Sequence, residues 1–136
     1  LERLGLDCGK DAVDPGLLGH WDWTLGDWGT MSFGAVGNQI RGVYTYRNGT
    51  VTVGPRDADG WYRGCWSEET RSKTTYGDYG QAMFRLRTDG TVDGRYNHIG
   101  PTEWREQWDL QRADPDEIPA EDVARLGDSS QFVSCD

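Results

Sequence analysis

Residues 103–112 carry the side-chain pattern best suited to chemistry in this chain. On an extended strand, side chains alternate between two faces, so Trp104, Glu106, Trp108 and Leu110 share one face. A carboxylate on a buried apolar face must be paired, protonated or bound to a ligand. Glu106 therefore either orients a cationic or hydroxyl group of a ligand between two stacking indoles, or pairs with an inward arginine or lies at the rim of the sheet.

A repeated pattern places further aromatic side chains on inward faces. Each copy has an apolar residue, a glycine two positions later and an aromatic two positions after that: Ile40-Gly42-Tyr44, Tyr62-Gly64-Trp66 and Val92-Gly94-Tyr96. Glycine weakens a strand, so a repeated inward glycine predicts a sharp bend or an aromatic ring from a neighbouring strand lying over bare backbone. We expect Tyr44, Trp66 and Tyr96 to line the same interior as Glu106.

Alternating runs of residues predict the strands that position these side chains. The expected strands span residues 19–24, 29–33, 39–46, 50–53, 60–67, 81–87, 91–96 and 103–112. Turn residues that tolerate positive φ separate several of them, as in Asn48-Gly49 and Asp59-Gly60, and such short connections join antiparallel neighbours. The sequence predicts an all-β fold, an eight-stranded antiparallel up-and-down barrel, with a two-sheet β-sandwich as the alternative.

The chain of 136 residues is expected to form one domain with two flanking segments. Residues 1–18 are irregular, residues 19–112 form the barrel, and residues 113–136 form a C-terminal extension. In the extension, Glu121 and Asp122 precede Val123 and Leu126, and Gly127 follows. Acidic residues at the start and a glycine at the end predict a short helix there.

Composition and charge exclude several classes of partner. Fourteen Lys and Arg against 23 Asp and Glu give a formal net charge of -9, which argues against nucleic acid because its phosphates require cationic side chains. No apolar run approaches the roughly 20 residues of a membrane-spanning helix, so we expect no membrane insertion. Seven tryptophans, six tyrosines and nineteen glycines favour strands with tight turns.

Three cysteines leave one without a partner. Cys8 and Cys135 lie near the two ends of the chain, whereas Cys65 lies inside a predicted strand. If the domain termini meet, Cys8 and Cys135 form a disulfide and Cys65 is a buried free thiol. A disulfide implies an oxidising compartment, so the expected location is secreted or periplasmic. The chain begins at Leu1, which fits either a removed export signal or a cloned fragment.

The remaining polar residues give little sign of catalysis. His20 and His98 are the two histidines, and neither has the spacing of a metal site. A hydrolytic triad would need one of them beside a serine, but Ser32, Ser67 and Ser72 lack the context of a nucleophile elbow. We therefore expect no metal, no cofactor and no enzymatic activity.

Aromatic residues in predicted turns and loops suggest a second kind of binding. Trp28 lies in the first turn, and Tyr76 and Tyr79 lie in the long polar connection after residue 67. Exposed rings on loops suit stacking against a sugar or docking on a protein.

The pattern of glycines and aromatics resembles the small up-and-down barrels of the avidin and lipocalin type. It comprises Gly-x-Trp at 19–21, Gly-x-Tyr or Gly-x-Trp at 42–44, 64–66 and 94–96, and short hairpins throughout 19–112. The resemblance implies a cavity at one end of the barrel that takes a small, largely apolar ligand. The acidic C-terminal extension departs from it.

These observations predict a non-enzymatic binding domain. Its expected ligand site comprises Tyr44, Trp66, Tyr96, Trp104, Glu106 and Trp108. One alternative is a structural or interaction subunit of an extracellular or cell-surface assembly, with a filled interior, a protein partner and possible oligomers. Another is a carbohydrate-binding module that uses Trp28, Tyr76 and Tyr79.

Overall fold

The computed structural model describes residues 15–24, 29–75, 77–98, 106–113 and 117–135. Over these residues the chain forms nine strand segments and one α-helix, close to the expected strands. The strands are β1 (Gly19–Trp23), β2 (Thr30–Val36), β3 (Gln39–Tyr44), β4 (Gly49–Val53), β5 (Trp61–Ser67), β6 (Tyr79–Leu86), β7 (Val92–Tyr96), β8 (Glu106–Gln107) and β9 (Leu110–Arg112).

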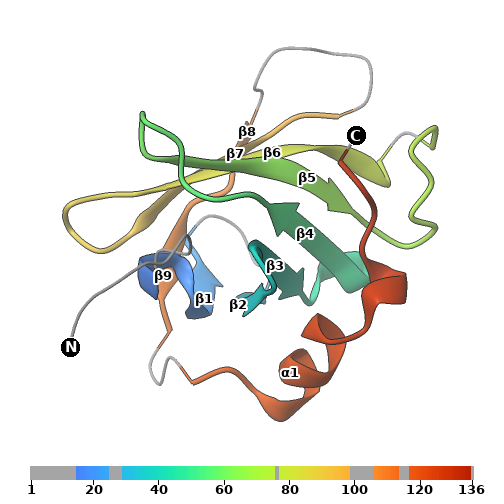
Figure 1. Cartoon of the computed structure of the whole chain (residues 1–136), viewed down its shortest axis with the longest axis horizontal. Helices are drawn as coiled ribbons and strands as arrows, with labels where there is room; N and C mark the ends of the chain where they lie inside the picture. Colours follow the sequence, from blue (N-terminus) through green and yellow to red (C-terminus); the bar gives the residue numbers. More distant parts are fainter. Residues whose placement is uncertain (1–14, 25–28, 76, 99–105, 114–116, 136) are drawn as a thin grey trace.

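The sheet closes on itself, which confirms the predicted eight-stranded antiparallel barrel (Figure 1). Strands β1 to β7 pair in sequence order, β9 pairs with β1, and β7 pairs with both β8 and β9. Segments β8 and β9 are the halves of the expected eighth strand. That strand is interrupted at Trp108 and Asp109, where the Gly94 N–H is 3.3 Å from the Asp109 carboxylate.

Aromatic rings inside the barrel lie over glycines on neighbouring strands. Four directly paired positions combine a ring with a glycine: Phe33 with Gly42, Tyr44 with Gly49, Trp66 with Gly80, and Phe84 with Gly94. In each pair, a Cβ on the glycine would come within 3.1 Å of the ring. The expectation of rings over bare backbone is therefore confirmed for Gly42 and Gly94 of the repeat, and the same arrangement occurs at Gly49 and Gly80, which the repeat does not include.

One end of the barrel is closed by the segment before β1. Leu17, in the 3-10 helix η2 (Pro15–Leu17), is fully buried, and its carbonyl accepts a 2.9 Å hydrogen bond from the Trp21 indole. The guanidinium of Arg112 lies 3.9 Å from the Trp21 ring centroid and donates to the carbonyls of Gly16 and Leu18. These contacts join the segment before β1 to both β1 and β9 at this end of the barrel.

The C-terminal extension packs on the outside of the barrel (Figure 1). Helix α1 (Ala120–Leu126) follows Pro119, ends at Gly127 as predicted, and lies over β2 and β3, with Leu126 against Gly34. The 3-10 helix η4 (Ser129–Gln131) comes next, and the chain then runs along β4 and β5.

The predicted disulfide between Cys8 and Cys135 is wrong, because Cys135 is bonded to Cys65, with 5.5 Å between their Cα atoms. The side chain of Cys65 points outward from β5, opposite to the buried Trp66, and so faces the C-terminal segment that passes over this strand. Cys65 is therefore not a free thiol. Cys8 lies outside the described residues.

Candidate functional site

Aromatic side chains gather at the barrel end opposite Leu17. Strands end or begin here on either side of residues 24–29, 45–48, 68–78 and 97–105, and we call this end the loop end. Around it lies a group of rings that we call the aromatic cluster, which comprises Trp23, Tyr44, Trp66, Phe84, Tyr96, His98 and Trp108. Four of the six expected ligand residues belong to it: Tyr44, Trp66, Tyr96 and Trp108.

Trp108 is the centre of the aromatic cluster. Its ring centroid lies 5.1 Å from that of Tyr44, 5.5 Å from Tyr96, and 5.4 Å from both Trp23 and Phe84. Tyr44 and Trp108 are buried, whereas Trp23 and Tyr96 are only partly buried. The cluster therefore has a buried floor and a rim that solvent reaches.

Trp108 also carries a polar atom without a partner. The indole N–H of Trp66 donates to the Asn97 carbonyl at 3.0 Å, but the buried N–H of Trp108 has no acceptor among the described residues. A buried donor left unsatisfied costs about 1–3 kcal/mol. Such a donor, surrounded by rings, is suited to meet an acceptor on a bound molecule.

A buried hydrogen bond connects the cluster to the connection 68–78. The Tyr44 hydroxyl donates to Glu68 Oε2 at 2.6 Å, and both residues are buried. Burial raises the pKa of the Glu68 carboxyl, while the Tyr44 hydrogen bond and the Arg47 guanidinium act in the opposite direction. Burial, followed by the Glu68 carboxylate, raises the pKa of Tyr44 well above its ordinary value. The Tyr44 hydroxyl therefore stays protonated and acts as the donor.

Arg47 joins the two connections that flank this hydrogen bond. Its guanidinium contacts Glu68 at 3.4 Å and Asp78 at 2.9 Å, and it also pairs with Glu69. The non-glycine residues with positive φ in the described structure all lie on these two connections, namely Arg47, Asn48, Glu69 and Arg71. Such backbone costs energy and persists where the surroundings impose it, often at functional sites.

The other expected site residues are not brought to the cluster by the described structure. Trp104, Trp28 and Tyr76 lie outside the described residues. Glu106 begins β8 and pairs with Tyr96, but its side chain is outside the described part of the structure, so its role stays a prediction. Tyr79 begins β6 with its ring partly buried, and the Lys73 ammonium lies 5.5 Å from the ring centroid.

Trp23 and His98 also belong to the cluster, although neither is among the ligand residues expected from the sequence. The ring of His98 lies 5.5 Å from Trp66 and 5.6 Å from Tyr96. Its position just after β7 could have signalled this, because the ends of neighbouring strands meet at one end of a barrel.

His20 lies beside a serine, in an arrangement that differs from a hydrolytic triad. Ser32 Oγ donates to Asp122 Oδ2 at 2.7 Å and is 2.7 Å from His20 Nδ1. Ser32 thus lies between the other two, whereas a triad has histidine in the middle to take the serine proton. Ser32 is fully buried, so the set fastens α1 to the barrel.

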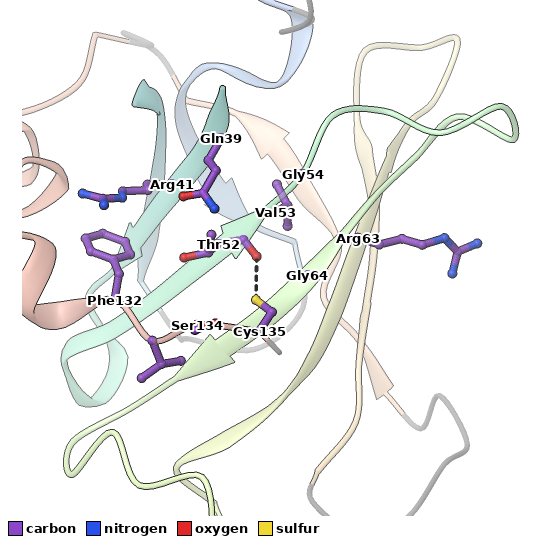
Figure 2. A pocket seen from close by; sticks show the side chains of 11 residues that line it. Gln39, Arg41, Thr52, Val53, Gly54, Arg63, Gly64, Phe132, Ser134 and Cys135 are labelled. Atoms are coloured by element: carbon purple, nitrogen blue, oxygen red, sulfur yellow. Dashed lines mark hydrogen bonds between the residues drawn. The ribbon is translucent and has the colours of Figure 1, made fainter. Parts of the chain in front are cut away.

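A groove of about 360 Å³ lies on the outer face of β3, β4 and β5, beside residues 132–135 (Figure 2). The two charged residues that line it, Arg41 and Arg63, already interact with other groups of the protein. Arg41 donates to the Leu126 carbonyl and lies 4.6 Å from the Phe132 ring centroid, and Arg63 pairs with Asp57 at 2.7 Å. Figure 2 shows the Arg63 side chain extending away from the other lining residues. The aromatic cluster is therefore the stronger candidate site.

Metal sites, membrane helices and relatives give no further assignment. Among the described residues, no group of three or more His, Cys, Asp or Glu is placed to hold a metal ion. No helix in the described ranges is long and apolar enough to cross a membrane. No protein-family model matches this sequence, and no curated protein or solved structure shows significant similarity to it.

Proposed function

We propose that this chain is a non-enzymatic binding protein of the lipocalin or avidin type, which holds a small, largely apolar ligand at the loop end of its barrel. The closed barrel supports this proposal. So does the difference between its two ends: Leu17 and Arg112 close one, whereas the aromatic cluster lies at the other.

The observation that carries the proposal is the buried N–H of Trp108, which has no acceptor within the part of the chain that the structure describes. It calls for a ligand that offers a hydrogen-bond acceptor to a buried, ring-lined surface. The cation–ring contacts of the described residues involve other rings: Phe132, Tyr79, Trp61 and Trp21. Burying a carboxylate or phosphate without a cationic partner is costly, so the acceptor is an uncharged group such as a carbonyl.

The disulfide supports the proposed compartment. A bond between Cys65 and Cys135 is compatible with an oxidising environment, and we propose a secreted or periplasmic location on that basis. In such a compartment, a barrel whose apolar site offers a buried hydrogen-bond donor would carry or sequester a poorly soluble neutral molecule.

The neutral naphthyl ketone prodan is a suitable probe, because its emission depends on both polarity and hydrogen bonding. We expect saturable binding with a blue-shifted emission. Trp108→Phe keeps a ring in the cluster and removes the N–H, so binding should weaken about three- to tenfold, the value of one hydrogen bond. The stability of the variant combines the relief of an unsatisfied donor, which is favourable, with the loss of buried ring volume, which is unfavourable.

Two controls make this test specific. Trp61→Phe changes a tryptophan on the outer face of β5, beside Arg85, and should leave prodan binding unchanged. The dimethylaminonaphthalene parent compound, which lacks the ketone, should bind wild type and Trp108→Phe equally. Equal prodan affinities for wild type and Trp108→Phe would contradict the role of the indole N–H.

The interaction-subunit alternative is favoured by the core, which comprises fifteen buried residues in the described ranges, among them Trp21, Phe33, Tyr62 and Phe84. Against it, the exposed large hydrophobic side chains in the described ranges are Tyr46 and Val123 alone, on different elements. Native mass spectrometry separates the two functions: a retained small molecule supports the site, and a stable multimer without one supports assembly.

A further inference from the structure

We infer that residues 120–135 form a disulfide-locked support for the ligand site, with Arg125 as its positioning residue, so that reducing the Cys65–Cys135 bond weakens ligand binding. This inference rests on the proposed function of the aromatic cluster. It assigns to the C-terminal extension a regulatory role that depends on redox state.

Arg125 holds the backbone at both ends of the connection 45–48. From α1, its guanidinium donates to the Tyr44 carbonyl at 3.0 Å and to the Gly49 carbonyl at 2.9 Å. Tyr44 is the ring that packs on both Trp108 and Trp23. One residue on the outside of the barrel therefore fixes the backbone of a ring inside the ligand site.

The connection that Arg125 holds is one that would otherwise relax. Arg47 has a left-handed φ of 49°, which a long side chain adopts when neighbouring contacts impose it, whereas Asn48, with a φ of 55°, tolerates this conformation. Arg47 in turn contacts Glu68, and Glu68 accepts the Tyr44 hydroxyl. Tyr44 is thus held at its carbonyl by α1 and at its hydroxyl by the connection 68–78.

The segment that carries Arg125 is fastened at both of its ends. Asp122 accepts the Ser32 hydroxyl at the start of α1, and Thr50 donates to the Gln131 carbonyl at 2.8 Å. The disulfide to Cys65 then fixes the last part of the segment to β5. Without this bond, the contacts after α1 are hydrogen bonds and a ring contact, which open more readily than a covalent link.

The disulfide can be reached from solvent on one side. Cys135 is exposed, whereas Cys65 is 2 % exposed. A small external thiolate would attack the Cys135 sulfur, form a mixed disulfide there and release Cys65 as the thiolate, which takes a proton. A second external thiol then displaces Cys135, so two external thiols are oxidised to one disulfide while the protein gains two thiols.

The experiment compares Arg125→Ala and Arg125→Lys with Arg112→Ala, under conditions where all are folded. Arg112 is the matched control, because it also donates to two backbone carbonyls but at the closed end of the barrel. We expect Arg125→Ala to speed amide exchange at residues 45–49 about tenfold and to weaken prodan binding about fivefold. Arg125→Lys should show smaller changes in amide exchange and in prodan binding than Arg125→Ala. Arg112→Ala should leave both quantities unchanged.

The redox part is tested with wild type reduced by a mild thiol and with Cys135→Ser. Both should weaken prodan binding about threefold and speed exchange at residues 45–49. Equal effects of Arg125→Ala and Arg112→Ala would overturn the positioning role, and unchanged binding and exchange after reduction would overturn the redox role. If oxidised wild type does not bind prodan, the proposed function fails, and amide exchange still decides whether Arg125 and the disulfide hold this connection.

Discussion

Gly64 on β5 approaches β4 so closely that a Cβ would lie 1.7 Å from the carbonyl oxygen of Thr52. Elsewhere in the repeat, a Cβ on Gly42 would meet the ring of Phe33, and a Cβ on Gly94 would lie 2.1 Å from the Trp108 carbonyl oxygen and 3.1 Å from the Phe84 ring. At Gly64 the neighbour is backbone, which cannot move aside without disturbing the pairing of β4 with β5. This glycine therefore serves the bend of the sheet rather than the packing of a ring.

Gly64→Ala should destabilise the barrel by about 3 kcal/mol, since the added methyl must displace the backbone of a neighbouring strand. Chemical denaturation of the variant measures this loss. The matched control is Gly54→Ala, where the nearest atom to the new Cβ is the Arg63 carbonyl oxygen at 4.0 Å. A Gly64→Ala protein as stable as Gly54→Ala would show that β4 and β5 separate easily here.

The disulfide predicts a single labelled thiol. Maleimide labelling under denaturing, non-reducing conditions should modify Cys8 alone, and peptide mapping should recover Cys65 joined to Cys135. Because the bond spans a sequence separation of 70 residues, Cys135→Ser should lower stability by about 4 kcal/mol in the chain-entropy view. Three labelled cysteines in the oxidised protein would contradict the pairing.

Glu68→Gln should change how stability depends on pH. Burial raises the pKa of Glu68 in the folded protein, so the folded state binds this proton more tightly than the unfolded state. The contribution of Glu68 to folding stability is therefore favourable below the ordinary glutamate pKa, and it is lost as the pH rises through the raised pKa of the folded protein. The stability of Glu68→Gln relative to wild type should therefore increase as pH rises from about 4 to 7. Denaturation at several pH values tests this, and a relative stability that falls over this range would contradict it.

Ser32→Ala should cost about 2 kcal/mol, because the buried Asp122 carboxylate loses its hydroxyl donor. Ser130→Ala is the control, since Ser130 is an exposed serine that also hydrogen-bonds an aspartate, Asp128. Thermal melts should show a clear drop for the first variant and a small one for the second. Equal melting temperatures would mean that the Ser32 link does not hold α1 on the barrel.

The strands and their inward faces could be predicted because alternation of side chains depends only on local sequence. Tyr44, Trp66 and Tyr96 each lie within two residues of the end of a predicted strand, so their meeting at one end of the barrel follows from antiparallel order. Trp108 was also placed correctly on an inward face.

Contacts between distant segments could not be predicted in the same way. The pairing of Cys135 with Cys65 depends on the path of the chain after α1, which no periodicity encodes. The break in the last strand depends on Asp109 meeting the Gly94 N–H across the sheet. The link from Ser32 to Asp122 joins residues 90 positions apart, and nothing near either residue signals the other.

The bond between Cys65 and Cys135 also determines what a protease can release. It encloses β6, β7, β8, β9 and α1 in one covalent ring, together with the connections 68–78 and 87–91. A single cut within that ring leaves both fragments attached, so the nicked protein runs as one band until it is reduced. A cut in the connection 45–48 lies before the ring and separates the chain into two pieces that non-covalent contacts alone hold together. After a single cut, the later half of this barrel therefore stays covalently connected, and the earlier half does not.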